Sequence, residues 1–290
     1  MSALSRLLPL FFVLLWSTGF IGAKYGLPYA EPLTFLVTRY ALVIALMTLV
    51  ALAMRAPWPA NAREATHIAV TGLLLHGIYL SGVFISIDRG LPAGISALVV
   101  GMQPLLTGAL AGLLLGERVS RRQWMGLALG FGGVALVVGS KASVDSLAPE
   151  TLWHMVIPAV AALFGITAGT LYQKRFCPRF DLRTGSVVQF LPTLAVSAII
   201  ALNTETMHIE WTGDFIFALG WLVVVLSVGA VSLLGLLIRS GSAVNVASLF
   251  YLTPPATALI AWAMFDERLS ALAITGMGIA VGGVWLARKG

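Results

Sequence analysis

Charged residues are scarce in this chain. Asp, Glu, Lys and Arg together make up 10% of its 290 residues, whereas hydrophobic residues make up 59%. Soluble domains carry about 25% charged residues. So little charge cannot cover the surface of a soluble globular protein. The composition therefore predicts a protein that uses lipid as part of its solvent.

Cysteine is almost absent as well. The single Cys177 excludes an intramolecular disulfide, and because it stands beside basic residues we expect a reduced thiol on the cytoplasmic side. The net charge of +6 does not predict binding to nucleic acid. That interpretation requires a basic patch on a folded surface, whereas the basic residues here lie in short loops between apolar runs.

The motifs of several chemistries are also missing. The sequence has no G-x-x-x-x-G-K-[ST] phosphate loop, so it gives no support for direct ATP drive. It offers no metal-ligand motif, and His76 has no acidic partner within an apolar run, so we expect no enzyme, no metal and no cofactor. Proton relays in membranes usually use an acidic residue inside a span. None lies there, so proton coupling would need His76 or an edge carboxylate such as Asp88, and uniport is equally consistent.

Long apolar runs are what the sequence does contain. A helix needs about 20 mainly apolar residues to cross a bilayer. Ten such runs predict an all-α integral membrane protein with ten transmembrane helices. They are 7–27, 32–54, 66–87, 92–116, 121–140, 152–174, 183–203, 215–239, 243–265 and 270–288. The first run could pass for a signal peptide, but Phe20 or Ile21 would occupy a cleavage-site position that needs a small residue, so we interpret it as a span.

Lys and Arg in the short connections predict the orientation. If the N-terminus is cytoplasmic, most of these residues lie inside, and the outer connections hold only Arg89, Lys141 and Arg268. Cytoplasmic loops carry the excess of basic residues in membrane proteins. Both termini are therefore predicted to face the cytoplasm. Short loops and the lack of an organellar presequence favour the inner (cytoplasmic) membrane of a bacterial cell, crossed in multiple passes.

An internal repeat relates the two halves of the chain. Residues 97–136 align without a gap on residues 247–286, so that Pro104 meets Pro254 and Glu117 meets Glu267. Spans one and six match more weakly. This predicts two five-helix repeats, residues 1–145 and 146–290, that form one transport domain. Because five is odd, the second repeat enters the bilayer from the opposite side, an inverted arrangement that is typical of secondary transporters.

Particular motifs resemble a known family. "LLWSTGFIGAKYG" in the first span, "MQPLLTGALAGLLLGERVSRRQWMGLALGFGGVALV" and "TPPATALIAWAMFDERLSALAITGMGIAVGGVWL" resemble the drug/metabolite transporter superfamily, in its EamA-type branch. The first half looks most like YddG-type amino-acid exporters. The resemblance implies a ten-helix carrier that exports small metabolites. "FDER" replaces the commoner "LGER" of the family, so Asp266 departs from the pattern and has no assigned role.

The function predicted from these observations is secondary transport. We expect export of neutral, aromatic or hydrophobic amino acids by alternating access at a midplane cavity between the repeats. The alternative is a carrier of phosphorylated sugars, nucleotide-sugars or drug-like cations. The expected partners are a small-molecule substrate and membrane lipid, with no nucleic acid, and the protein is predicted to be a monomer or a weak homodimer.

Polar and aromatic residues deep in the spans are the candidates for binding substrate, because such positions are costly in a bilayer. His76 and Tyr79 share one face of the third span, although a histidine that only bonds a neighbouring helix is an equal alternative. The full set of predicted substrate-binding residues is Trp16, His76, Tyr79, Gln103, Tyr172, Asn245, Tyr251 and Trp262.

Charged residues within or beside spans are the candidates for gating. Lys24 and Arg39 lie inside apolar runs, and Asp88 lies at the edge of one. Arg39 needs a partner, for which we expect Glu31 or Asp88. Either cation could instead receive a substrate carboxylate.

Prolines and corner carboxylates are predicted to be structural. Pro104, and the pair Pro254 and Pro255, each remove a backbone donor and free carbonyls near Val100, and near Phe250 and Tyr251. Glu117 and Glu267 are expected to stabilise the start of the following helix and to pair with the adjacent arginine. Two series of small residues predict close helix contacts, either within the protein or at a dimer face. They are Gly108, Gly112 and Gly116, and Gly126 and Gly130.

Overall fold

The computed structural model describes most of the chain as helices. The residues described are 3–91, 93–139, 149–177, 179–256, 259–260 and 270–289. Trp262, Asp266 and Glu267 therefore lie outside the described residues, and so do the side chain of Lys24 and the end of the predicted span 243–265.

The first half of the chain forms helices up to residue 139. They are α1 (Ala3–Gly26), the 3-10 turn η1 (Leu27–Tyr29), α2 (Pro32–Ala53), α3 (Ala62–Gly72), the π-helical η2 (Leu73–Ile78), α4 (Tyr79–Asp88), α5 (Ala93–Val100), α6 (Gln103–Leu115) and α7 (Arg121–Gly139). The π-helical η2 continues α3 into α4, so residues 62–88 form one span.

The second half forms a similar series of helices. It comprises α8 (Pro149–Phe176), α9 (Leu182–Thr204), α10 (Gly213–Trp221), the π-helical η3 (Leu222–Ala230), α11 (Val231–Ser240), α12 (Ala243–Ser248), the 3-10 turn η4 (Leu249–Leu252) and α14 (Ala271–Arg288). Short polar side chains fix several helix starts by accepting a backbone N–H of the first turn, as expected for N-caps. The N-caps are Asn61 for α3, Asp181 for α9, Thr212 for α10, Ser242 for α12 and Ser270 for α14.

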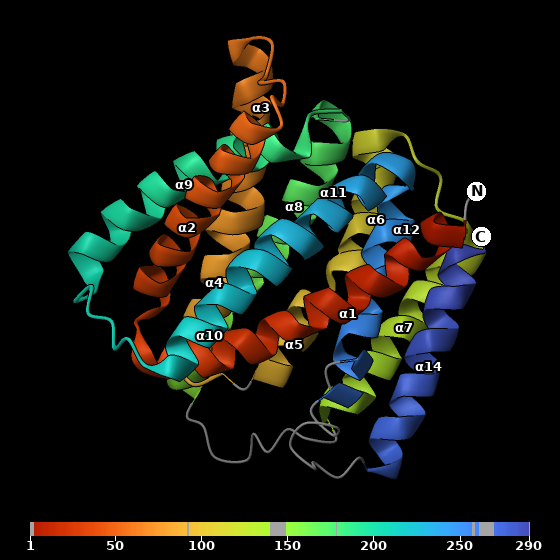
Figure 1. Ribbon diagram of the computed structural model, residues 1–290. Coiled ribbons are helices and arrows are strands. Elements are labelled where there is room, and N and C mark those ends of the chain that lie inside the picture. The colour runs from red at the N-terminus through yellow and green to blue at the C-terminus, as the bar shows by residue number, and fades with distance from the viewer. Residues whose placement is uncertain are drawn as a thin grey trace.

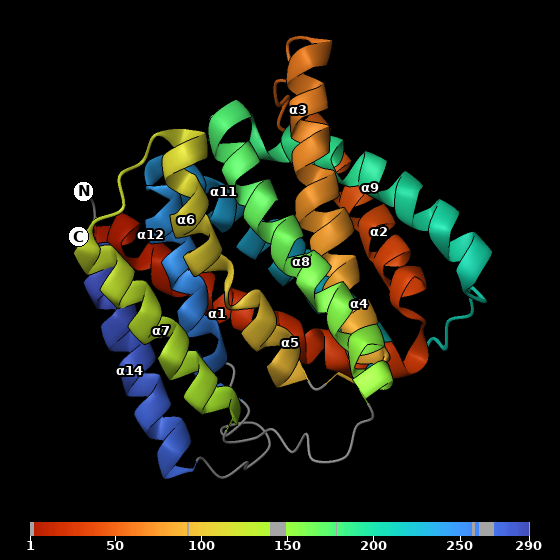
Figure 2. The same ribbon diagram turned by 180° about the vertical axis from the view of Figure 1, so that it is seen from behind.

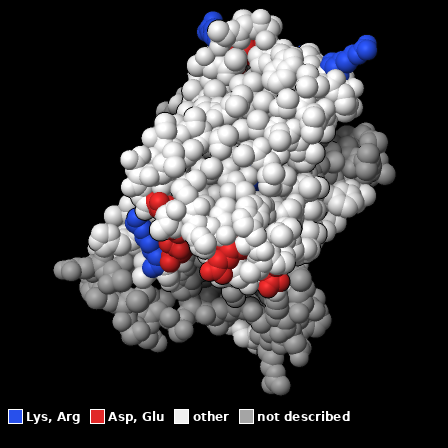
Figure 3. Space-filling view, turned by 60° about the vertical axis from the view of Figure 1, so that its left-hand side comes forward, with Lys and Arg blue, Asp and Glu red and all other residues white. Residues whose placement is uncertain are grey.

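Seven helical stretches of the described residues are long and apolar enough to cross a membrane. They are Pro32–Ala53, Ala62–Asp88, Ser96–Leu115, Trp153–Phe176, Leu182–Thr204, Gly213–Ser240 and Ala271–Arg288. Each coincides with a run predicted from the sequence. One face of the molecule has a broad belt almost free of visible charge between charged side chains at its two ends (Figure 3). The protein is therefore a multi-pass membrane protein.

Two ends of the bundle can be distinguished in Figure 1, with α2–α3 and α8–α9 joined at the upper end and α1–α2 and α9–α10 joined at the lower end. The chain termini lie close together near one edge. Figure 2 shows the same arrangement from behind, with α7 and α14 side by side along that edge. The terms upper end and lower end are used below in this sense.

Helix bounds recur at a fixed offset in the two halves. Helices α2 and α9 begin at Pro32 and Leu182, and α7 and α14 begin at Arg121 and Ala271, a distance of 150 positions in both cases. The two π-helical stretches begin at nearly the same offset, because η2 starts at Leu73 and η3 at Leu222, which is 149 positions later. The offset seen in the sequence thus recurs in these helix bounds and in the two π-helical stretches, whereas η1 and η4 have no equivalent in the other half among the described residues.

The contact between α7 and α14 depends on glycine. A Cβ atom placed on Gly126 would lie 2.7 Å from the carbonyl oxygen of Gly283, and one on Gly276 would lie 2.7 Å from that of Gly133. These two contacts are equivalent at the 150-residue offset. Low residue numbers of α7 face high numbers of α14, so the helices pack antiparallel. Gly126 and Gly130 therefore serve a helix contact within the protein.

Gly116 ends a helix and does not mediate the close helix contact predicted for it. It ends α6 with φ +69°, a left-handed conformation that favours glycine, and a Cβ atom there would meet nothing within 4 Å. It is a helix C-cap, and its place in the small-residue spacing with Gly108 and Gly112 is incidental.

Carboxylates join α2 to the end of α9 at the lower end. Glu205 accepts the backbone N–H groups of Leu33 (2.8 Å) and Thr34 (2.7 Å), which the start of a helix leaves without intrahelical partners. Glu31 accepts the N–H (2.6 Å) and the hydroxyl (2.5 Å) of Thr206. The hydrogen bonds from Thr206 hold the pKa of the Glu31 carboxyl below its usual value. The lower ends of α2 and α9 are therefore tied together by polar contacts.

Candidate functional site

A central cavity lies between helices of both halves. It consists of two adjoining chambers with about 510 and about 430 Å³ of space free of protein atoms, part of it open to solvent. The residues that line both chambers are Trp16, Leu75, His76, Tyr79 and Val231. They stand where the chambers meet.

The two chambers extend toward opposite ends of the bundle. The first continues along Gly19 and Ala23 of α1 and Val83 and Phe84 of α4, toward the lower end. The second continues toward the α8–α9 connection at the upper end, and its further lining includes Gln173, Phe180, Leu182, Ser186 and Gln189. The cavity therefore has a constriction at Trp16, His76 and Tyr79 and a chamber on each side of it.

The π-helical turn η2 positions His76 at this constriction. A π-turn interrupts the regular hydrogen-bond ladder of a helix and is frequently found at functional sites. The backbone carbonyl of His76 accepts the hydroxyl of the fully buried Tyr40 at 2.7 Å. Tyr40 thus satisfies a backbone group inside the bilayer, where an unpaired one would be costly.

The ring of His76 is held by stacking. It lies on Phe190 of α9 with ring centroids 4.1 Å apart and planes 15° from parallel. The ring is 3% exposed, and its Nε2 has no hydrogen-bond partner among the described residues. The contacts of His76 with neighbouring helices are thus made by its ring, which lies on Phe190, and by its backbone carbonyl, which accepts from Tyr40.

Aromatic rings form one wall of the cavity. Trp16 stacks on Tyr79 with centroids 6.3 Å apart and an interplanar angle of 12°. Behind it, Trp16 meets Phe12 and Phe250 at 5.2 and 5.3 Å. This cluster presents a flat apolar surface, suited to a ligand with an aromatic or aliphatic side chain.

Arg39 of α2 brings a positive charge into the first chamber. Its side chain is only 3% exposed, and its Nε donates to the hydroxyl of Ser227 in η3 at 3.0 Å. The prediction that Glu31 or Asp88 would pair with it is wrong. Glu31 instead bonds Thr206, and in the part of the chain that the structure describes the one ion pair joins Arg183 to Asp181. Asp88 ends α4, and neither chamber includes it among its lining residues.

Four predicted binding residues lie away from the two chambers. Tyr172 hydrogen-bonds Nδ1 of His67 at 2.7 Å, because α8 packs beside α3. Tyr251 is fully buried, with its ring against Gly130 of α7. Gln103 and Asn245 lie on the adjoining α6 and α12, and they retain buried amide atoms without partners among the described residues.

The helix interruption expected at Pro104 is present. Helix α5 ends at Val100 and α6 begins at Gln103, so the break falls directly before the proline. Before Pro254 and Pro255 the chain forms the 3-10 turn η4. There the carbonyl of Phe250 accepts the N–H of Thr253, so the prediction that the Phe250 carbonyl would be free is wrong. A 3-10 turn satisfies that group locally, because it shortens the hydrogen-bonded ring.

Glu117 caps a different helix from the one predicted. Its two carboxylate oxygens accept the backbone N–H of Ala243 at 3.1 and 3.2 Å, at the start of α12 in the other half. The following helix α7 uses Ser120 and Gln123 as its capping pair. Glu117 therefore links the first half of the chain to the second through these hydrogen bonds.

Several polar lining residues were missed by sequence reasoning. Gln173 and Ser186 line the second chamber, as does Gln189, and Ser227 holds Arg39. Ser186 and Gln189 are three positions apart in an apolar run, so the rule that singled out His76 and Tyr79 would also have found them.

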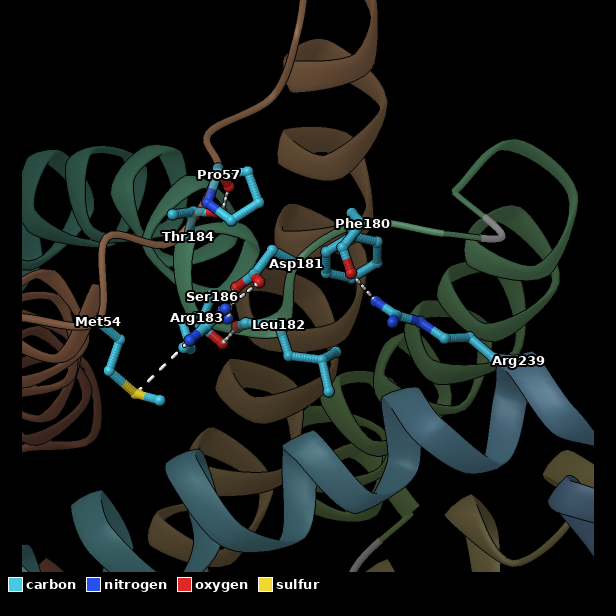
Figure 4. Close-up of polar contacts among 9 residues, drawn as sticks. All are labelled: Met54, Pro57, Phe180, Asp181, Leu182, Arg183, Thr184, Ser186 and Arg239. Atoms are coloured by element: carbon cyan, nitrogen blue, oxygen red, sulfur yellow. Dashed lines mark hydrogen bonds and ion pairs between the residues drawn. The ribbon is translucent and has the colours of Figure 1, made fainter. Parts of the chain in front are cut away.

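The α8–α9 connection closes the second chamber at the upper end. Figure 4 shows Arg239 extending from α11 toward Phe180, beside the start of α9. Its guanidinium donates to the carbonyl of Phe180 and lies over the ring, with Cζ 4.8 Å from the centroid. Asp181 accepts from Arg183 at 2.6 and 3.0 Å, and this pairing holds the pKa of the Asp181 carboxyl below its usual value. Arg239 thus holds Phe180 in the wall of the chamber.

Cys177 can report on this closure, because it lies three residues before Phe180 and is 5% exposed. Burial raises the pKa of its thiol, which slows alkylation because the thiolate is the reactive form. Arg239→Gln is expected to raise the maleimide labelling rate of Cys177 about tenfold or more, since a charged hydrogen bond contributes about 1.5–3 kcal/mol. Arg63→Gln, at an exposed position of the same end, is the control. Equal labelling rates in the two variants would show that Arg239 does not hold the connection closed.

A bundle of apolar helices around a central cavity, with Arg39 as the one buried cation among the described residues, is the framework of a multi-pass membrane transporter. Residues 5–139 and 153–288 each match the EamA-like transporter family. The chain therefore belongs to the EamA-like transporter family, and the double match parallels its two halves.

Named relatives span nearly the whole chain. It is 27% identical to the "Uncharacterized transporter YvbV" of Bacillus subtilis (strain 168), over 97% of this chain and 90% of that protein. It is 25% identical to the "Probable amino-acid metabolite efflux pump" of Escherichia coli (strain K12), over 99% and 95%. It is 24% identical to the "Uncharacterized inner membrane transporter YedA" of the same strain, over 98% and 92%. These relatives indicate a transporter rather than an enzyme.

The fold also matches a solved structure described as "Crystal structure of protein". The TM-score is 0.79 at 21% sequence identity, and the match covers 100% of this chain and 98% of that one. At that identity the match establishes the fold.

Proposed function

We propose that the protein is a secondary transporter that exports neutral amino acids with aromatic or hydrophobic side chains. The observation that carries this proposal is Arg39, a buried guanidinium without a carboxylate partner among the described residues, in a chamber walled by Trp16 and Tyr79. A buried charge is costly unless it is paired. A substrate carboxylate would supply the pair, and the aromatic wall would receive its side chain.

The amino group of such a substrate would meet neutral acceptors. Ser186 and Gln189 offer side-chain oxygens in the second chamber, and His76 lies beside them, where the two chambers meet. No Asp or Glu is found among the lining residues that the structure describes. The set suits a zwitterion, whose single positive charge is balanced by its own carboxylate.

We propose that ten spans form two inverted five-helix repeats, residues 1–145 and 146–290, with both termini in the cytoplasm and the protein in a bacterial inner membrane. The equal offsets of α2 to α9 and of α7 to α14, and the equivalent glycine contacts of Gly126 and Gly276, support the repeat. The cytoplasmic side would then be the upper end, where Arg239 lies. A relative named as an inner membrane transporter supports the location.

Alternating access would use the two ends in turn. At the upper end Arg239 holds Phe180, and at the lower end Glu31 and Glu205 hold α2 against the end of α9. Opening one set of contacts while the other stays closed would expose one chamber at a time, as inverted repeats rock about a fixed site. The π-helical η2 and η3 are natural points for this bending, because their hydrogen-bond ladders are already irregular.

The relatives named as probable amino-acid metabolite efflux pumps support the substrate class and the direction of export. The alternative, a carrier of phosphorylated sugars, nucleotide-sugars or drug-like cations, is less well supported. A phosphate dianion would favour several cations, whereas Arg39 is the one Lys or Arg among the described lining residues, and its positive charge would repel a cationic drug.

Counterflow in proteoliposomes tests the substrate class. Vesicles that contain purified protein are preloaded with one unlabelled compound, and uptake of labelled phenylalanine is followed. We expect exchange with neutral amino acids and none with sugar phosphates, nucleotide-sugars or lipophilic cations. Exchange driven by a sugar phosphate and by no amino acid would contradict the proposal.

A further inference from the structure

Two basic groups far apart in the sequence meet at the upper end of the α7–α14 pair. Arg121 and Arg122 begin α7, and Arg288 and Lys289 end or follow α14. Because the two helices pack antiparallel through their glycines, the start of α7 lies beside the end of α14. All four side chains are exposed. The fold therefore builds a basic corner that neither segment forms alone.

A tryptophan lies between two of these cations. Trp285 of α14 is 55% exposed, with the Arg122 guanidinium carbon 5.9 Å and the Lys289 Nζ 4.1 Å from its ring centroid. Cation–π contacts of this kind orient exposed cations. Tryptophan is also the residue that membrane proteins place at the level of lipid headgroups.

Among the described residues, no acidic side chain forms an ion pair with these four cations. Glu117, which is close in sequence to the start of α7, directs both carboxylate oxygens to the N–H of Ala243. Helix α7 also starts here, with Ser120 as its cap, and the N-terminus of a helix carries partial positive charge and free N–H groups. Charge and backbone thus favour an anion at the same place.

An exposed apolar surface continues directly from the basic corner. Met125 and Leu129 of α7 are 61% and 47% exposed, and Val281 of α14 is 54% exposed. Cβ atoms on Gly278 and Gly282 would meet nothing within 4 Å, so the space beside the backbone of α14 is open at these two positions. Such a surface has room for acyl chains beside the headgroup position.

We propose that this corner binds one anionic phospholipid, with its phosphate at Arg122, Lys289 and the start of α7 and its acyl chains along α7 and α14. Basic pockets between transmembrane helices are suited to anionic headgroups. The apolar surface next to the cations favours a lipid over a soluble anion, because a free phosphate would make no use of it. This site is separate from the central cavity and does not depend on the transported substrate.

Native mass spectrometry and thermal stability of the purified full chain test the site. Phosphatidylglycerol is compared with phosphatidylcholine of the same acyl chains and with inorganic phosphate. The Arg122→Gln/Lys289→Gln double variant is compared with the wild type and with Arg55→Gln/Arg63→Gln, which removes two exposed cations from the same end. Each cation near the headgroup contributes about fivefold in affinity, so the first double variant is expected to bind phosphatidylglycerol about 25-fold more weakly.

Retention of phosphatidylglycerol by the wild type and the Arg55/Arg63 control, and its loss from the Arg122/Lys289 variant, would support the site. Equal binding of phosphatidylglycerol and phosphatidylcholine by the wild type would overturn it. Equal stabilisation by inorganic phosphate would show that the acyl surface is not used and would also overturn it. A dimer that forms without lipid and covers Trp285 would assign the surface to a second copy instead.

Discussion

Replacing Arg39 with glutamine is expected to reduce counterflow of neutral amino acids about 100-fold. The change removes the one cation among the described lining residues while leaving a side chain that can still hydrogen-bond Ser227. Breaking a buried charge pair with the substrate costs about 3 kcal/mol or more, which corresponds to a factor of about 100. The measurement is the initial rate of labelled phenylalanine exchange at a concentration well below saturation.

Stability separates a binding role of Arg39 from a structural one. A buried guanidinium without a carboxylate destabilises the fold that holds it, so Arg39→Gln is expected to leave the thermal midpoint unchanged or to raise it. Ser227→Ala keeps the charge and is expected to lower exchange only a fewfold. If Arg39→Gln exchanges at a rate close to wild type, or loses activity only together with its fold, the carboxylate site is not at Arg39.

Alanine at Gly133 is expected to destabilise the protein, whereas alanine at the adjacent Gly132 is not. A Cβ atom on Gly133 would lie 2.4 Å from the backbone nitrogen of Ala280 in α14, so the two helices would have to move apart. Overpacking of this kind costs about 1–3 kcal/mol. A Cβ atom on Gly132 would meet nothing within 4 Å, and alanine there gains helix propensity of up to about 1 kcal/mol.

The midpoint of thermal unfolding in detergent measures this difference, with yield of monodisperse protein as a second readout. Gly132→Ala is a matched control, since it makes the same substitution in the same helix. Equal midpoints for the two variants would show that α7 and α14 tolerate a wider spacing than the structure has. The glycine contacts between α7 and α14 would then not fix the distance between the two helices.

Seven of the predicted apolar runs are found as long apolar helices among the described residues, because such runs depend on local composition. Apolar runs of about 20 residues and capping residues such as Asn61 and Ser270 are local features that fix helix bounds within a few positions. The aligned prolines and glycines anticipated the offset of 150 residues. Irregular turns were foreseen only where a proline marks them, and the π-helical η2 and η3 carry no such mark.

The site was predicted in part, for a physical reason. Trp16, His76 and Tyr79 were found because depth in a span is readable from the sequence, and the structure brings these three together at the constriction. Depth does not tell which way a side chain points. Gln103 and Tyr251 are as deep but lie among α6, α7, α12 and η4.

Partners across the fold could not be predicted. Arg39 bonds Ser227 and Glu117 bonds Ala243, each of them more than 100 positions away. Such pairs depend on which helices become neighbours, and neighbours along the chain were the only partners that sequence reasoning could test. The expected pairs with Glu31 and with the helix after Glu117 were wrong for that reason.

The most direct test of the account is whether the wild-type protein requires the substrate carboxylate. Vesicles preloaded with unlabelled phenylalanine, with phenethylamine or with phenylpropionate are compared for their ability to drive uptake of labelled phenylalanine. Binding of the carboxylate by Arg39 predicts that phenylalanine drives exchange and that phenethylamine, which has the same ring and amino group without the carboxylate, does not. Exchange driven as well by phenethylamine as by phenylalanine would contradict the account, because the buried cation would then have no part in recognition.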